Sequence, residues 1–196
     1  RAGQTAGLIM SGQLDEITGN ESLEELKDKL NKNLAVGSKI GVDRRLDFDG
    51  DFSTVFGGKA LEAFKRGEYL KFLVEQSDQL AESLQDKNAE TYSQMAKRVA
   101  EIVKKYLDIA PHWDKLVQGG DEDYDNTLKR FLGTHQGILE SFLAKVIEKT
   151  KGKADRDAFV SALHNQGFDF VDGFDVTIET VNDGNQNIRI LFKKEK

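Results

Sequence analysis

Three aspartates alternate with aromatic and small residues in the segment "RRLDFDGDFSTVFGG" at positions 44–58. A bent loop can bring the carboxylates of Asp47, Asp49 and Asp51 together around Ca²⁺ or Mg²⁺, since both ions prefer oxygen ligands. The EF-hand pattern does not fit, because an aromatic residue stands where that loop needs glycine, and a glycine where it needs glutamate. The alternative is a turn whose carboxylates accept hydrogen bonds from nearby backbone N–H groups. We favour the turn and keep the metal site as a second hypothesis.

A second acidic segment, "GDEDYD", allows a comparison with a known family. The motif "DFDG", which begins at Asp47, resembles the opening D-x-D-G motif of the haloacid-dehalogenase-like phosphatases, and "GDEDYD" resembles their later G-D-x-x-x-D motif. The resemblance implies Asp47 as nucleophile and Asp49 as general acid/base. It also implies Asp121 and Asp125 beside a Mg²⁺ ion, and a parallel sheet beneath the site. The segment 59–108 instead has helical periodicity without the β–α alternation of such a sheet.

A possible ligand site lies at His112 and Trp113, which directly follow the only proline, Pro111. We expect both residues in a loop, where they would form one wall of a small-ligand pocket. His135 lies among apolar residues at helical spacing and is expected to be a hydrogen-bonded core or interface residue. The nucleophile elbow of serine hydrolases, the P-loop and the dinucleotide-binding glycine motif do not occur in the sequence.

The composition excludes several classes of site and partner. There are no cysteines, which excludes disulfides, zinc–thiolate sites and cysteine nucleophiles. The net charge of −6 argues against nucleic-acid binding. No apolar run approaches the roughly 20 residues of a membrane span. The first residues lack the apolar segment of a signal peptide and do not begin with Met, so we expect a chain processed or shortened at its N-terminus, of unknown localisation.

The elements that must position these residues are mostly helices. Apolar residues recur every three to four positions in several segments, and Gly67 and Pro111 are expected to interrupt them. Ser22 and Glu25 have the spacing of a capping box at the start of the first helix. The predicted helices span about 21–33, 59–85 with a break at Gly67, 89–108 ending before Pro111, 126–149, and 155–165.

The C-terminal part changes to the period of β-strands. "FDVTIETV" and "NIRILFKK" alternate apolar and polar residues, and Asp183-Gly184 between them suits a tight turn. We therefore predict an α+β fold that is predominantly α-helical. It is an irregular bundle of four to five helices with a C-terminal β-hairpin, in one domain over 1–196. The helical body covers about 20–166 and the hairpin about 168–194.

The leading functional hypothesis is a non-catalytic interaction or structural protein, such as a subunit, adaptor, inhibitor or processed component of an assembly. It follows from the lack of a coherent catalytic set and from a hairpin whose edge can add to a partner's sheet. It predicts a protein partner or self-association. The alternatives are a metal-dependent hydrolase or phosphatase that uses Asp47, Asp49 and Asp51 with Ca²⁺ or Mg²⁺, and a helical module that binds a small ligand at His112 and Trp113.

Overall fold

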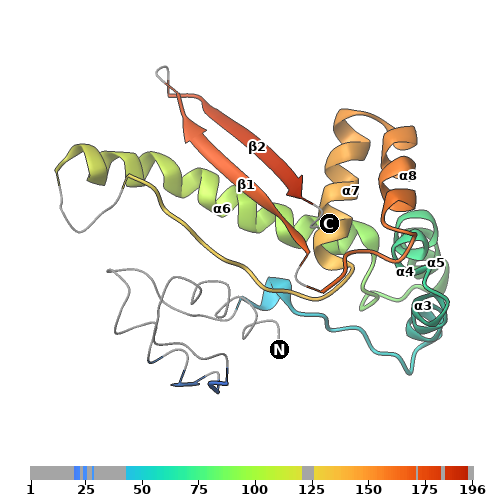
Figure 1. Cartoon of the computed structure of the whole chain (residues 1–196). Helices are drawn as coiled ribbons and strands as arrows, with labels where there is room; N and C mark the ends of the chain where they lie inside the picture. Colours follow the sequence, from blue (N-terminus) through green and yellow to red (C-terminus); the bar gives the residue numbers. More distant parts are fainter. Residues whose placement is uncertain are drawn as a thin grey trace. The chain divides into compact units, whose positions relative to one another are not determined.

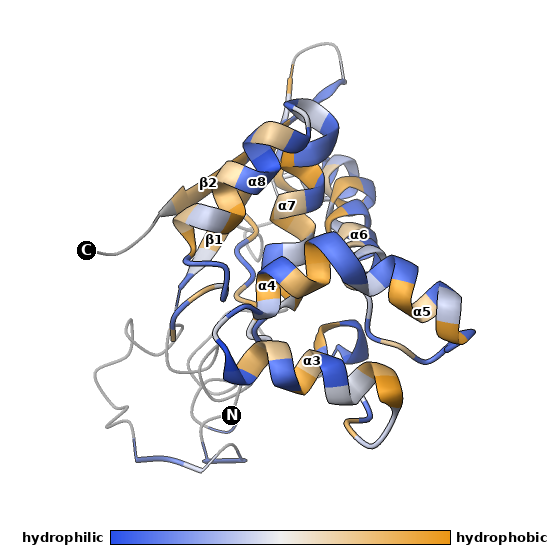
Figure 2. Ribbon diagram, turned by 90° about the vertical axis from the view of Figure 1, so that its right-hand side faces the viewer, coloured by the Kyte–Doolittle hydropathy of each residue, from blue (hydrophilic) through white to orange (hydrophobic). Residues whose placement is uncertain are grey.

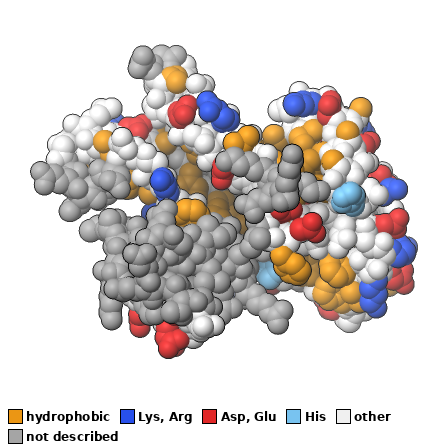
Figure 3. Space-filling model, viewed as in Figure 1, with side chains coloured by type: hydrophobic (Ala, Val, Ile, Leu, Met, Phe, Trp, Pro, Cys, Tyr) orange, Lys and Arg blue, Asp and Glu red, His pale blue; other side chains and the backbone are white. Residues whose placement is uncertain are grey.

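The computed structural model confirms a predominantly helical fold with a C-terminal antiparallel β-hairpin (Figure 1). It describes residues 20–22, 24–25, 28, 43–120, 126–170, 172–181 and 184–193. In these residues, no helix combines the length and the apolar character that crossing a membrane requires. Figure 3 shows that acidic and basic side chains are intermixed on one face of the molecule.

The elements follow one another as helices and then strands. A short 3-10 turn, η1, precedes α3, and a π-helical segment, η2, joins α4 to α5. The bounds are η1 Arg44–Leu46, α3 Val55–Lys65, α4 Tyr69–Phe72, η2 Leu73–Ser77, α5 Asp78–Leu84, α6 Tyr92–Gln118, α7 Ile138–Thr150, α8 Lys153–Ala162, β1 Gly173–Thr180 and β2 Gln186–Lys193.

By internal packing the chain forms two compact units, which we describe separately. The helical unit comprises the described residues of Arg45–Val103, His135–Phe174 and Phe192–Lys196. The α6–hairpin unit comprises those of Arg1–Arg44, Lys104–Thr134 and Asp175–Leu191.

The core of the helical unit is formed by the apolar stripes of its helices. Figure 2 shows hydrophobic and hydrophilic residues alternating along α3 to α8, as helices packed on one side require. Leu70, Met95 and Ile138, from α4, α6 and α7, are completely or almost completely removed from solvent. Aromatic pairs extend this core, with Phe56 and Phe72 at 5.8 Å and Phe142 and Phe174 at 5.8 Å between ring centroids.

The predicted break at Gly67 is confirmed. α3 ends at Lys65, Gly67 adopts a φ of +73°, and α4 begins at Tyr69. The capping box at Ser22 and Glu25 is also present, because the Glu25 N–H donates to Ser22 Oγ and the Ser22 N–H donates to Glu25. Most of the predicted helix at 21–33 lies outside the described residues. The predicted helix at 155–165 corresponds to α8.

The prediction that Pro111 ends a helix is wrong, because α6 continues through it to Gln118. Proline lacks the N–H that would bond the carbonyl four residues earlier, which here belongs to Leu107. The side-chain amide of Gln186 donates to that Leu107 oxygen at 2.8 Å, within the α6–hairpin unit. The hairpin thus supplies the hydrogen bond that the helix cannot make for itself.

The predicted helix at 126–149 begins only at Ile138, and its first half was wrongly assigned. Gly137 has a φ of +94°, which no regular α-helix contains. The side chain of Glu140 accepts a hydrogen bond from the Gly137 N–H at 2.8 Å and so fixes the start of α7. His135 lies before this start and is exposed, so it is not the core residue that was predicted, and its alternative place in an interface stays a prediction.

The hairpin has the predicted strands and a defined register. The Val181 N–H donates to the Asn185 carbonyl at 2.8 Å, and Gly184 adopts a φ of +80°. Asp183 of the predicted turn lies outside the described residues. Counting back from that pair, the register places Ile178 opposite Ile188 on the same face.

Candidate functional site

The acidic loop at 47–51 forms the predicted type of turn at Asp51. Asp51 Oδ1 accepts hydrogen bonds from the Ser53 N–H at 2.8 Å and from the Ser53 hydroxyl at 2.7 Å. These bonds lower the pKa of Asp51. Thr54 then caps α3, since its Oγ1 accepts from the Gly57 N–H at 2.9 Å. The loop is therefore tied to the start of a helix.

The same loop forms one side of a small pocket of about 100 Å³, which we call the acidic pocket. Its other sides are the first turns of α3, the start of α4 and the segment 86–90. Its acidic residues are Asp49, Asp51, Asp86 and Glu90. Its aromatic side chains are Phe48, Phe52, Phe56 and Tyr69. Asp47 is not among the residues that line it.

Glu90 is the buried carboxylate of the acidic pocket. Both of its oxygens accept hydrogen bonds from the guanidinium of Arg98, one of them at 2.9 Å. Burial raises the pKa of Glu90 and Arg98 opposes that shift. The nearby carboxylate of Asp49 adds to it, while a hydrogen bond from the Asp49 backbone N–H acts to lower it. The pocket thus contains a pair of like charges, Asp49 and Glu90, and Arg98 compensates only the buried member.

Tyr69 is the buried tyrosine of the acidic pocket. The residue is 5% exposed, and in the part of the chain that the structure describes its hydroxyl makes no hydrogen bond. Burial is the main cause of its raised pKa, followed by the negative charges of Glu90 and Glu140. The ring packs edge-on against Phe64 at 5.9 Å. A buried polar side chain is expected to have a partner, and Tyr69 instead lines the acidic pocket with its hydroxyl unpaired in the described residues.

The metal hypothesis stays a prediction. Within the described residues, no three His, Asp or Glu side chains are grouped so as to hold a metal ion. Asp121 and Asp125, which the phosphatase resemblance places beside Mg²⁺, lie outside those residues. The sheet found in the described part of the chain has two strands in one hairpin, rather than the parallel sheet that this resemblance implies.

His112 and Trp113 lie within α6, so the predicted loop at this place is wrong. His112 is exposed and Trp113 is half-buried. Neither residue lines the acidic pocket or the groove between α5 and the start of α6. Ligand binding at these two residues therefore stays a prediction.

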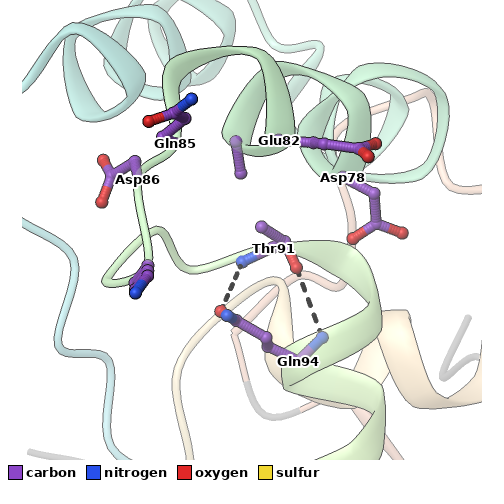
Figure 4. Close-up of a pocket in the computed structure, with 8 residues that line it drawn as sticks. Asp78, Glu82, Gln85, Asp86, Thr91 and Gln94 are labelled. Atoms are coloured by element: carbon purple, nitrogen blue, oxygen red, sulfur yellow. Dashed lines mark hydrogen bonds between the residues drawn. The ribbon is translucent and has the colours of Figure 1, made fainter.

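A second, more open groove of about 450 Å³ lies between α5 and the start of α6 (Figure 4). Its acidic residues are Asp78, Glu82 and Asp86. Two of the groove's residues have structural tasks: Asp78 accepts from the Ser93 N–H at 3.1 Å, and Thr91 accepts from the Gln94 N–H at 3.4 Å. These contacts satisfy the N–H groups that a helix leaves unpaired at its start. This groove, which we call the α5–α6 groove, is thus lined by residues that cap the start of α6.

Glu140 is a second buried carboxylate, away from both cavities. One of its oxygens accepts from the Gly137 N–H and the other from the Phe168 N–H, each at 2.8 Å. Burial raises the pKa of Glu140 to about 7, although these hydrogen bonds oppose the shift. Gly167 lies so close that an added Cβ would be 2.7 Å from the carboxylate. Glu140 therefore joins α7 to the segment that leads into β1.

Sequence reasoning missed Tyr69, Glu90 and Glu140. Glu140 had a signal, because a glycine followed three residues later by glutamate fits a helix start. Nothing local marks Glu90 or Tyr69, since their burial depends on elements distant in the chain.

Comparison with known proteins found no matching family model, no matching curated protein and no matching solved structure.

Proposed function

We propose that this chain is a non-catalytic interaction protein that binds an extended, acidic segment of a partner protein along the edge of β2. The carrying observation is that β2 belongs to a two-stranded sheet, so among the described strands only β1 pairs with it. Ile188 and Leu191 of β2 are 49% and 47% exposed. A strand with open hydrogen-bonding groups and half-exposed aliphatic side chains is a template for another strand.

The register identifies the backbone groups that a partner would use. Val181 and Asn185 form a hydrogen-bonded pair, so alternate residues along β2 direct their N–H and C=O groups toward β1. The residues between them, including Ile188 and Ile190, direct theirs away from β1. An added strand would bond to these groups without disturbing the hairpin.

The charge of β2 favours an acidic partner. Arg189 is exposed on the strand, and the sequence continues with Lys193, Lys194 and Lys196. Symmetric pairing of two β2 strands would bring like charges together, which opposes a dimer formed through this edge. Aspartate or glutamate on the added strand would instead meet opposite charge.

The hydrogen bonding of the acidic side chains and the positions of the histidines support a non-catalytic role. Asp51, Glu90 and Glu140 each have structural hydrogen-bond partners. The three histidines, His112, His135 and His164, are all exposed. None of the three lines the acidic pocket or the α5–α6 groove, where a general base would be expected.

The test is calorimetric titration with a synthetic peptide that alternates Glu with Val and Ile. Ile188→Pro removes an outward N–H from the edge, and Arg189→Glu reverses the charge. We expect each to weaken binding by about tenfold or more. Lys65→Glu, an exposed charge reversal on α3, should leave affinity unchanged. Equal binding of the corresponding Gln peptide, or no binding of the Glu peptide, would contradict the proposal.

A further inference from the structure

We propose that the acidic pocket binds the primary ammonium group of an aliphatic chain, as presented by a lysine side chain of a partner or by a free alkylamine. This site goes beyond the proposed function, because the acidic pocket belongs to the helical unit and shares no residue with β2. The inference rests on the size of the pocket, its charge, its aromatic walls and the hydroxyl of Tyr69.

The size limits the occupant to a small group. A volume of about 100 Å³ is well below the roughly 300 Å³ at which sites for drug-sized ligands begin. A water molecule occupies about 30 Å³ of liquid, so the pocket has room for an ammonium group and a short run of methylenes.

The charge makes the occupant a cation. Four acidic residues line the pocket and, among the described residues, no lysine or arginine does, while the guanidinium of Arg98 is already bound to Glu90. The Asp49 carboxylate is exposed and has no hydrogen-bond partner in the described part of the chain. A cation placed between Asp49 and Glu90 would relieve the repulsion between these two like charges.

The walls favour an organic cation over a metal ion. Phe48, Phe52 and Phe56 line the pocket together with the ring of Tyr69. Ca²⁺ and Mg²⁺ require oxygen ligands on most sides, whereas an ammonium group is attracted by aromatic rings and its methylenes pack against them. Tyr69 is 5% exposed, and its hydroxyl, without a hydrogen-bond partner in the described residues, supplies a neutral acceptor for an ammonium N–H.

The pocket is held in shape by its own backbone. A Cβ at Gly57 would lie 2.0 Å from the Asp51 carbonyl oxygen, so the acidic loop rests directly on the first turn of α3. The Asp51–Ser53 and Thr54–Gly57 hydrogen bonds fix the same junction. A site that is already formed loses less entropy when it binds.

The first experiment is titration of the whole chain with n-butylammonium, followed by amide NMR. We expect saturable shifts confined to the amides of the loop at 48–52 and of Ala89 and Glu90. n-Butanol, which has the same shape without charge, should leave them unmoved. Equal shifts with n-butanol, or shifts spread over the surface, would overturn the proposal. Ca²⁺ or Mg²⁺ displacing n-butylammonium from these amides at lower concentration would replace it with the metal hypothesis.

Variants locate the interaction. Asp49→Asn removes an exposed, unpartnered charge, and Tyr69→Phe removes only the hydroxyl, so neither should unfold the chain. We expect Asp49→Asn to weaken n-butylammonium binding by about tenfold and Tyr69→Phe by about threefold. Glu82→Gln, a matched loss of charge in the neighbouring groove, should have no effect. Equal losses for Glu82→Gln and Asp49→Asn would show a general charge effect and overturn the site.

A second arm distinguishes the two sources of the ammonium group. A short peptide with one central lysine is compared with n-butylammonium, and the same peptide with norleucine is the neutral control. Tighter binding of the lysine peptide, lost in Asp49→Asn, identifies a partner's side chain. Equal affinities of the lysine peptide and n-butylammonium identify a free amine as the source of the ammonium group. Failure of both lysine and n-butylammonium contradicts the pocket while leaving the β2 edge untouched, because that edge is tested by an acidic peptide.

Discussion

Two buried glutamates in the helical unit are satisfied in different ways. Glu140 is 1% exposed and its oxygens accept from two backbone N–H groups. Glu90 is 8% exposed and is bound by the guanidinium of Arg98. Backbone dipoles hold the first without any opposite charge, while a full positive charge holds the second.

The difference separates a structural carboxylate from one that borders a binding pocket. Without a countercharge, Glu140 keeps the desolvation cost of its charge, and its pKa is raised to about 7. Glu90 is partly neutralised, but the Asp49 carboxylate beside it is not, so negative charge remains at the pocket. The first arrangement ties two segments together, and the second leaves a site for a cation.

The largest predicted effect is the pH dependence that Glu140 produces. Its carboxyl titrates near pH 4.5 when unfolded and near 7 when folded. Between these values the folded state holds the proton that the unfolded state has lost, so stability falls as pH rises, by up to about 3 kcal/mol. Glu140→Gln removes this dependence. The variant's free energy of unfolding, measured with denaturant, should therefore be lower than that of the wild type at pH 4.5, and the difference should shrink as the pH rises to 7.

Glu148→Gln provides a control of opposite sign. Desolvation acts to raise the pKa of Glu148, but the hydrogen bond from Tyr92 and the charges of Lys145 and Arg156 outweigh it and lower the pKa. The stabilising contribution of Glu148 is lost as pH falls. The loss of unfolding free energy in Glu148→Gln should therefore become smaller toward acid pH. The same trend for both variants would contradict the assigned roles.

Next in size is the loss of Arg98 from the Glu90 pair. Arg98→Leu leaves a buried carboxylate without its cation, and we expect unfolding to become easier by about 2 kcal/mol, since Arg98 is itself partly exposed. Adding Glu90→Leu to Arg98→Leu should recover most of the loss. If Arg98→Leu alone is neutral in urea titrations at pH 7, the guanidinium does not hold Glu90 as described.

The smallest change in stability is expected for the hydrogen bond between Gln186 and Leu107, because its donor and acceptor are both neutral. Gln186→Leu deprives the Leu107 carbonyl of its donor in the α6–hairpin unit, at a cost of about 1 kcal/mol. Pro111→Ala restores an N–H for that carbonyl, so the cost of Gln186→Leu should largely disappear in the Pro111→Ala background. Thermal unfolding of the four chains measures the coupling. Additive effects would mean that Gln186 does not substitute for the missing N–H.

The sequence alone determined the features that depend on neighbouring residues. The apolar periodicity, the break at Gly67, the Ser22–Glu25 cap and the alternating strands were all predicted, because each follows from local backbone and side-chain preferences. The hydrogen-bonded turn at Asp51 also follows from contacts within a few residues.

Only the tertiary structure decided which polar groups would be buried and by what they would be satisfied. Pro111 lies inside α6 where a strand residue replaces the missing donor, and Glu90 and Tyr69 border a pocket because the segments 48–52 and 86–90 meet. Desolvation and hydrogen bonding between distant segments carry no local signature. A residue's neighbours in the chain therefore predict its conformation, whereas its neighbours in space set its charge and its partners.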